Sequence, residues 1–309
     1  MRLPLATGGE RVAATLEALG LRCVISIPGS QTLPIWDALP RRPALRLVVP
    51  RTERNGALMA EGYGLVARFP AVLLSTLGPG VANELVGLRS AAASGAPLLC
   101  ISPAQPPNKL ARIRDVFQGL DHGRFLGGVC KASLRIEPDG RGLEQTLERA
   151  LAACLEPPPG PARLDIAFPA LFQRRLRAAR RVRPAPRPAP PAGPVVVRDP
   201  SVPEPRLRQE LARLPGPARV LTPGLALPGG GLPLALGARL ACEDAVTVVI
   251  ADDRLLEQMD SLAVARLHDV PLCVVGEPQR RLAGLFGARV ADEPEPRPGE
   301  LTVVAVGTG

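Results

Sequence analysis

The sequence contains few lysines, histidines and aromatic residues. Lys109 and Lys131 are the only lysines among 38 basic residues, and the chain has two histidines, six Phe, one Trp and one Tyr. Because proteins bind single-stranded nucleic acids largely by stacking aromatic rings on the bases, we expect no nucleic-acid partner, although the net charge is +9. The two histidines, His122 and His268, are too few for a metal site built from several histidines. Nothing in the sequence pairs with His122, so we expect it to be a polar loop residue.

Paired cysteines and long apolar runs are absent as well. The six cysteines are scattered and form no Cys-x-x-Cys pair, which is typical of small buried side chains in a reducing compartment rather than of disulfides or a zinc site. No run approaches the roughly 18 apolar residues that cross a bilayer, and the first residues lack the apolar run of a signal peptide. We therefore expect a cytoplasmic protein with no membrane partner.

The apolar pattern alternates between strand and helix along both parts of the chain. Short apolar runs typical of buried parallel strands are found at 22–27, 45–49, 71–75, 97–102, 246–251 and 272–275. Helical spacing lies between them, at 7–19, 31–39, 53–67, 81–93, 205–214, 234–241 and 255–267. A chain of 309 residues has room for two domains. The expected fold is therefore α/β, with two doubly wound parallel-sheet domains.

A basic, proline-rich segment separates the two parts. Seven arginines lie between Arg174 and Arg187 with no acidic residue among them, and prolines follow closely. Such a composition predicts an extended linker, which its prolines keep out of helices and sheets. This linker is either a solvated spacer or a basic tether for an acidic partner. The expected organisation is an amino-terminal domain at 1–173, a linker at 174–200 and a shorter domain at 201–309.

Three segments of the first domain resemble one family. The sequence at 24–30 ends in Pro-Gly-Ser, the sequence at 51–64 contains a glutamate followed by Ala and Gly-Tyr, and the sequence at 75–88 contains Gly-Pro-Gly-x-x-Asn. In this order and spacing they resemble the pyrimidine-binding domain of thiamine-diphosphate-dependent enzymes, above all those similar to acetolactate synthase. The resemblance continues to Gln118 and covers roughly residues 5 to 170. It implies cofactor-binding roles for Pro28, Gly29, Gly78, Pro79, Gly80, Asn83 and Gln118.

By this resemblance, Glu53 is the catalytic residue. The family's cofactor is activated when a carboxyl group protonates the ring nitrogen of its aminopyrimidine, and a rigid element next to a strand end must hold that carboxyl group. Without the resemblance, Glu53 is a glutamate in the first turn of a helix, where the helix dipole favours a negative charge. Both interpretations place it at the start of a helix.

The second domain resembles the family's diphosphate-binding domain, with altered residues at the metal site. Asp252 and Glu277 stand at the positions of the family's Mg²⁺ ligands, and Asp253 replaces a glycine beside the diphosphate. Mg²⁺ requires a near-octahedral set of oxygen ligands, and Asp252 and Glu277 are each able to contribute a carboxylate oxygen to it. The resemblance therefore implies thiamine diphosphate and Mg²⁺ as cofactors, with Asp253 in contact with the diphosphate. The extra carboxylates of Asp253 and Glu277 add negative charge near an anionic group.

The resemblance leaves alternative functions open. The first is a compact thiamine-diphosphate enzyme that decarboxylates or ligates a small 2-oxo acid and works as a homodimer or larger assembly. The second is a non-catalytic relative that keeps the fold and acts as a scaffold or regulatory partner. The third is one member of a pair, in which a related subunit supplies the diphosphate half.

Overall fold

The computed structural model describes most of the amino-terminal domain and the central part of the carboxy-terminal domain. The described residues are 5–110, 112–116, 118–176, 182–189, 194–214, 217–242, 247–250, 259–271, 273–276, 289–291 and 302–305. None of the described helices is both long and apolar enough to cross a membrane.

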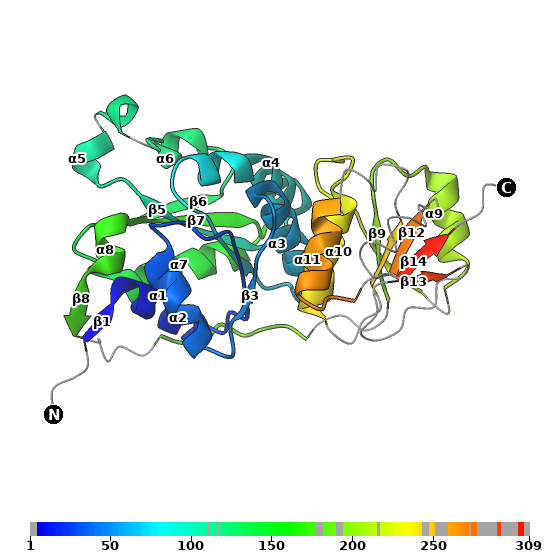
Figure 1. Ribbon diagram of the computed structural model, residues 1–309, viewed down its shortest axis with the longest axis horizontal. Helices are drawn as coiled ribbons and strands as arrows, with labels where there is room; N and C mark the ends of the chain where they lie inside the picture. Colours follow the sequence, from blue (N-terminus) through cyan, green and yellow to red (C-terminus); the bar gives the residue numbers. More distant parts are fainter. Residues whose placement is uncertain are drawn as a thin grey trace.

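A six-stranded parallel sheet forms the centre of the amino-terminal domain (Figure 1). Its order is β3-β2-β4-β5-β7-β6, with β2 at Cys23–Ser26, β3 at Arg46–Val48, β4 at Ala71–Leu74, β5 at Leu98–Ala104, β6 at Ala132–Ile136 and β7 at Pro161–Ala167. All residues of β2, β4, β5 and β7 are buried, as expected for parallel strands covered on both faces.

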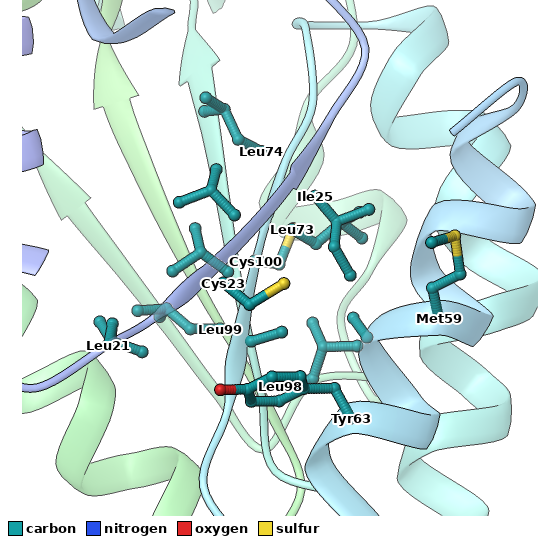
Figure 2. Close-up of a cluster of buried hydrophobic side chains, with 14 of the residues drawn as sticks. Leu21, Cys23, Ile25, Met59, Tyr63, Leu73, Leu74, Leu98, Leu99 and Cys100 are labelled. Carbon is teal, nitrogen blue, oxygen red and sulfur yellow. The ribbon is translucent and has the colours of Figure 1, made fainter. Parts of the chain in front are cut away.

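The helices of this domain are α1 (Gly8–Ala18), α2 (Leu33–Ala38), α3 (Glu53–Ala67), α4 (Pro79–Ser94), α5 (Pro107–Leu110), α6 (His122–Phe125), α7 (Leu143–Leu155) and α8 (Phe168–Phe172). Helix α1 begins with a capping box, in which Thr7 Oγ1 accepts from Glu10 N at 3.1 Å and Glu10 Oε2 accepts from Thr7 N at 2.7 Å. Figure 2 shows the core between the sheet and α3, where the side chain of Tyr63 extends from the helix toward buried side chains of the strands.

The carboxy-terminal domain contains a second six-stranded parallel sheet. Its order is β10-β9-β11-β12-β14-β13, with β9 at Val195–Arg198, β10 at Arg219–Leu221, β11 at Thr247–Ile250, β12 at Cys273–Gly276, β13 at Arg289–Ala291 and β14 at Thr302–Ala305. Its described helices are α9 (Glu204–Leu211), α10 (Gly231–Ala241) and α11 (Met259–Leu267). When the strands of each sheet are counted along the chain, both sheets have the same order, second-first-third-fourth-sixth-fifth. The expected α/β class with two doubly wound sheets is confirmed, and the domains share a topology that the sequence does not reveal.

Two helices, α3 and α10, join the domains through glycine contacts. A Cβ atom on Gly62 of α3 would lie 1.9 Å from the carbonyl oxygen of Leu234, and one on Gly237 of α10 would lie 1.7 Å from that of Met59. The two backbones therefore touch directly, which only glycine permits at these positions. In Figure 1, α10 and α11 lie between the two sheets, with α10 beside α3.

The basic segment between the domains is partly ordered against the amino-terminal domain. Strand β8 (Arg174–Leu176) pairs antiparallel with β1 (Leu5–Thr7), and Val182 and Ala185 pack against the hydrophobic core. The expectation that prolines keep the whole segment out of any sheet is therefore wrong for 174–176, which precede the first proline. The predicted domain limits at 173 and 201 stay predictions.

Candidate functional site

Loops at the carboxyl ends of β2 and β4 meet where the strand order reverses. Strand β2 leads outward to β3, whereas β4 leads to β5 on the other side, and such a switch point is where ligands bind in open α/β sheets. The two loops touch, because a Cβ atom on Gly29 would lie 2.8 Å from the side chain of Thr76. Gln31 bridges them: its Oε1 accepts from Thr76 Oγ1 at 2.9 Å, and its Nε2 donates to Gln118 Oε1 at 3.1 Å.

The Gly78-Pro79-Gly80 turn is fixed by close backbone contacts. Gly78 has φ +71°, and a Cβ atom there would lie 2.3 Å from the carbonyl oxygen of Gln118. Pro79 is the first residue of α4, where a missing N–H does not weaken the helix. The turn therefore requires glycine at position 78, and it brings Gln118 next to the start of α4.

A buried histidine supports this turn from beneath. Gly78 N donates to His122 Nε2 at 3.2 Å, and His122 Nδ1 lies 2.9 Å from Asp165 Oδ1, which also pairs with Arg163. Burial, aided by the charge of Arg163, lowers the pKa of His122 to about 3. The imidazole is therefore neutral at neutral pH, with Nδ1–H donating to Asp165. The sequence indicates only an unpaired polar loop residue at His122, and that interpretation is wrong.

Glu53 begins α3 at the edge of a cleft. Thr52 caps the helix by accepting from Asn55 N at 3.2 Å, and Glu53 itself is half-buried. Asn83 of α4 donates its Nδ2–H to Glu53 Oε2 at 3.1 Å, and a Cβ atom on Gly80 would lie 3.5 Å from Glu53 Oε1. Three of the residues singled out in the sequence therefore lie together: Glu53, Gly80 and Asn83.

Both domains line this cleft, which has a volume of about 650 Å³. The amino-terminal domain contributes Arg51 to Asn55 and Asn83, and the carboxy-terminal domain contributes Pro228, Gly229 and Asp260. The volume lies within the roughly 300–1,000 Å³ typical of small-molecule sites. A single chain thus supplies two facing walls, with the carboxyl group of Glu53 on one and a glycine turn on the other.

Contacts from both ends of α11 hold the chain on either side of Glu53, at Val49 and at Asn55. Asn55 Nδ2 donates to Asp260 Oδ2 at 2.6 Å and to Ser261 Oγ at 3.3 Å at the start of α11. Beyond its last turn, His268 Nε2 accepts from Val49 N at 2.9 Å. The position of Glu53 therefore depends on contacts that cross the domain boundary.

A buried carboxylate shapes the opposite wall. Asp199, at the end of β9, is fully buried and accepts from Gly229 N at 3.3 Å, Gly231 N at 2.9 Å and Ser201 Oγ at 2.7 Å. Gly231 is the first residue of α10, so Asp199 satisfies N–H groups at and before the start of that helix. This contact fixes the turn through Pro228 and Gly229 that faces Glu53.

Comparisons with known proteins relate the amino-terminal domain to a family. The model of the thiamine pyrophosphate enzyme, N-terminal TPP binding domain, matches residues 6–124, which include every first-domain residue that the sequence analysis proposed for the site. Within residues 6–124, the chain therefore carries the amino-terminal domain of the thiamine-diphosphate-dependent enzyme family. The matched range ends before β6, so the carboxy-terminal domain lies outside it.

Individual relatives agree with this family. The chain is 29% identical over 160 residues to the acetolactate synthase isozyme 1 large subunit of Escherichia coli, covering 52% of this chain and 28% of the relative. It is 30% identical over 155 residues to the 2-succinyl-5-enolpyruvyl-6-hydroxy-3-cyclohexene-1-carboxylate synthase of Rubrobacter xylanophilus, covering 48% and 26%. The matches thus span about a quarter of these relatives' length.

A solved structure shares the fold. The thiamine diphosphate-dependent 4-hydroxybenzoylformate decarboxylase of Rhodococcus jostii superposes with a TM-score of 0.72 at 14% identity, covering 97% of this chain and 99% of that chain. The superposition includes the carboxy-terminal domain, which the family model does not reach.

The expected site residues fall into three groups. Glu53 and Asn83 line the cleft, with Gly80 beside Glu53. Pro28, Gly29, Gly78 and Gln118 lie in the adjoining loops, and Pro79 begins α4; none of them is part of the described lining of the cleft. The predicted metal ligands Asp252 and Glu277, and Asp253, lie outside the described residues, among which no cluster of metal-binding side chains is found.

Several residues of the site were not singled out in the sequence. Asn55 and Asp260 are separated by more than 200 positions, so no local pattern connects them. Asp199 follows a strand and stands far from the helix that it caps. His122 and Asp165 are 43 positions apart, although an aspartate just beyond the middle of a buried strand was a usable signal.

Proposed function

We propose that this protein binds thiamine diphosphate in the cleft between its two domains and uses it to decarboxylate or ligate a small 2-oxo acid. The observation that carries the proposal is the placement of Glu53, whose carboxyl group faces a cleft lined by both domains and has Asn83 as its side-chain partner among the described residues. The relatives named above are an acetolactate synthase large subunit, a 2-succinyl-5-enolpyruvyl-6-hydroxy-3-cyclohexene-1-carboxylate synthase and a thiamine diphosphate-dependent decarboxylase.

The residues beside Glu53 fit the aminopyrimidine end of the cofactor. Gly80 has no side chain, so the space next to Glu53 Oε1 stays open. Asn83 leaves Glu53 Oε1 available while it donates to Oε2. A carboxyl group with one oxygen already bound and the other facing open space suits a contact to a single ring nitrogen.

In the proposed mechanism, Glu53 holds a proton at that ring nitrogen. When bound, thiamine diphosphate would supply the carbon-nucleophile and electron-sink chemistry that decarboxylation of a 2-oxo acid requires. Asn83 orients the Glu53 carboxyl group, and the Gly78-Pro79-Gly80 turn brings backbone close to the ligand. Arg51 and Arg54 on the cleft wall provide positive charge for an anionic substrate. Asp252 and Glu277 would hold Mg²⁺, with Asp253 beside the diphosphate.

The test of the role of Glu53 is a matched pair of substitutions. Glu53→Gln keeps the size of the side chain and removes the titratable proton, so turnover should fall by roughly 10²- to 10⁴-fold, the usual contribution of acid–base catalysis. Glu156→Gln, at an exposed position after α7, should leave turnover unchanged. Release of CO₂ from a panel of 2-oxo acids is the readout. Full activity in Glu53→Gln would refute the mechanism.

The metal assignment has its own experiment. Asp252→Ala should abolish the Mg²⁺ dependence of cofactor binding, because it removes one of the two proposed oxygen ligands. Calorimetric titration with and without Mg²⁺ measures this dependence. Binding that stays Mg²⁺-dependent in Asp252→Ala would show that the metal site lies elsewhere.

The non-catalytic alternative rests on Asp253 and Glu277. Both add negative charge where the family has neutral residues, and this charge opposes the binding of a diphosphate. A protein that binds no cofactor at millimolar concentration supports the scaffold function, whereas binding without turnover supports a ligand-binding relative. The expected homodimer stays a prediction, and light scattering of the purified protein measures it.

A further inference from the structure

A second cavity lies farther along α3 from Glu53, at Tyr63. It has a volume of about 280 Å³, and its described lining includes Arg22, Cys23, Arg46, Tyr63, Arg187 and Leu240. Cys23 and Arg46 come from strands of the amino-terminal sheet, and Arg22 directly precedes β2. The others come from α3, from residues 182–189 of the basic segment and from α10 of the carboxy-terminal domain. The cavity is therefore built where both domains and the basic segment meet.

The described lining carries three guanidinium groups and no carboxylate. Arg187 Nη2 donates to Tyr63 Oη at 2.7 Å, and the guanidinium carbon lies 5.8 Å from the centre of the Tyr63 ring. Arg22 donates to the carbonyl oxygen of Leu21 at 2.9 Å. Among the described residues, neither Arg22 nor Arg187 has an acidic partner within ion-pair distance. Arg46 is oriented by the bond that its Nη2 donates to the carbonyl oxygen of His268 at 2.8 Å.

Tyr63 adds a neutral donor at the same place. Its side chain is almost fully buried, and Figure 2 shows it extending from α3 toward Cys23 of β2. Its oxygen accepts from Arg187, and no acceptor for its own O–H is found in the described part of the chain. Burial raises the pKa of Tyr63 to about 12, so the hydroxyl keeps its proton at neutral pH.

We propose that this cavity binds a compact, multiply charged oxyanion, such as the phosphate group of a small metabolite. Arg22 and Arg187 supply charged donors, and the hydroxyl of Tyr63 supplies a neutral one. Arginine forks match the oxygens of phosphate in geometry as well as in charge. The volume lies just below the range of ordinary small-molecule sites, so the ligand is a small anion rather than a nucleotide or a nucleic-acid backbone.

Binding at this place has a structural consequence for the basic segment. Arg187 is the residue of that segment in the described lining, and Leu240 belongs to α10 of the other domain. An anion held between Arg22 and Arg187 therefore fastens the segment to the amino-terminal domain beside α10. This gives Arg187 of the segment a specific ligand in place of a spacer role.

The experiment uses inorganic phosphate as the probe and the full chain as the protein. Phosphate should raise the unfolding midpoint more than sodium chloride at equal ionic strength, because a ligand that binds only the folded state stabilises it. Calorimetry should give at least a tenfold weaker affinity for Arg187→Gln and for Tyr63→Phe. Arg183→Gln removes the same charge from an exposed position of the same segment outside the described lining, and should bind phosphate as the unmodified protein does.

Three results would overturn the proposal. Phosphate that stabilises no more than chloride shows that no site is present. Equal losses in Arg183→Gln and Arg187→Gln show that the effect is one of net charge. Binding that persists in Arg187→Gln and is lost in Arg51→Gln places the phosphate in the cleft beside Glu53.

Discussion

The substitution Gly237→Ala tests whether the α3–α10 contact holds the cleft together. The added Cβ atom would start 1.7 Å from the carbonyl oxygen of Met59, and backbone atoms of Met59 are its three nearest neighbours. Backbone cannot rotate away as the end of a flexible side chain does. The two helices must therefore separate by more than about 1 Å to reach an allowed contact.

Two opposing terms set the size of the effect on stability. Overpacking of this kind costs about 1–3 kcal/mol, and the backbone contact places Gly237→Ala in the upper part of that range. Replacing glycine by alanine in a helix interior stabilises the helix by about 0.5–1 kcal/mol. We therefore expect a net loss of about 1–2 kcal/mol in the free energy of unfolding.

The same separation weakens the contacts that position Glu53. The bonds from Asn55 to Asp260 at 2.6 Å and from Val49 to His268 at 2.9 Å cross the same boundary. Lengthening either by about 1 Å takes it to or beyond the limit of a hydrogen bond. Affinity for thiamine diphosphate should consequently fall at least about tenfold, which corresponds to roughly 1.4 kcal/mol.

The assay pairs denaturant unfolding with calorimetric titration of the cofactor. Gly160→Ala is the control, because its Cβ atom would meet the side chain of Lys131 at an ordinary 3.5 Å. Gly237→Ala should be less stable than this control and should bind the cofactor more weakly. Equal stability and equal affinity in the two variants would refute the claim that the helix contact builds the cleft.

Two further predictions concern pH. Burial raises the pKa of Glu84 to about 7, so the stability that its protonated form contributes is present below pH 4.5 and is lost as pH rises through about 7. The loss in the free energy of unfolding is about 3 kcal/mol. Glu84→Gln should remove this loss, so the variant should be more stable than the unmodified protein at pH 8. Denaturant unfolding at pH 5 and pH 8 measures the difference, and an unchanged pH dependence contradicts the prediction. Burial lowers the pKa of His268, whose neutral ring accepts from Val49 N, so the stability from this group is lost as pH falls below 6.5. His268→Gln should lose less stability than the unmodified protein between pH 7.5 and pH 5.5, and equal losses would show that His268 is not the group that titrates.

Local patterns were sufficient to predict the elements that carry the candidate site. The helix expected at 53–67 is α3 itself, because Thr52 provides the cap and the apolar residues repeat at helical spacing. The strand expected at 71–75 is β4 within one residue, because a short apolar run between turn residues has few other solutions. The placement of Glu53 at a helix start follows from these two elements.

Contacts between distant segments were not predictable in the same way. The pairing of Asn55 with Asp260 depends on how α3 packs against α10. In the sequence alone, Gly62 and Gly237 indicate only positions that lower helix stability. The pairing of His122 with Asp165 depends on the neighbouring positions of β5 and β7 in the sheet. Both signals exist only once the chain is folded.

The central claim is that thiamine diphosphate binds in the cleft that Glu53 shares with Gly229. Calorimetric titration of the full chain with thiamine diphosphate, in the presence and absence of Mg²⁺, tests it most directly. We predict saturable, Mg²⁺-dependent binding with a micromolar dissociation constant, weakened at least about tenfold in Gly237→Ala. The absence of binding at millimolar cofactor with Mg²⁺ would contradict the account.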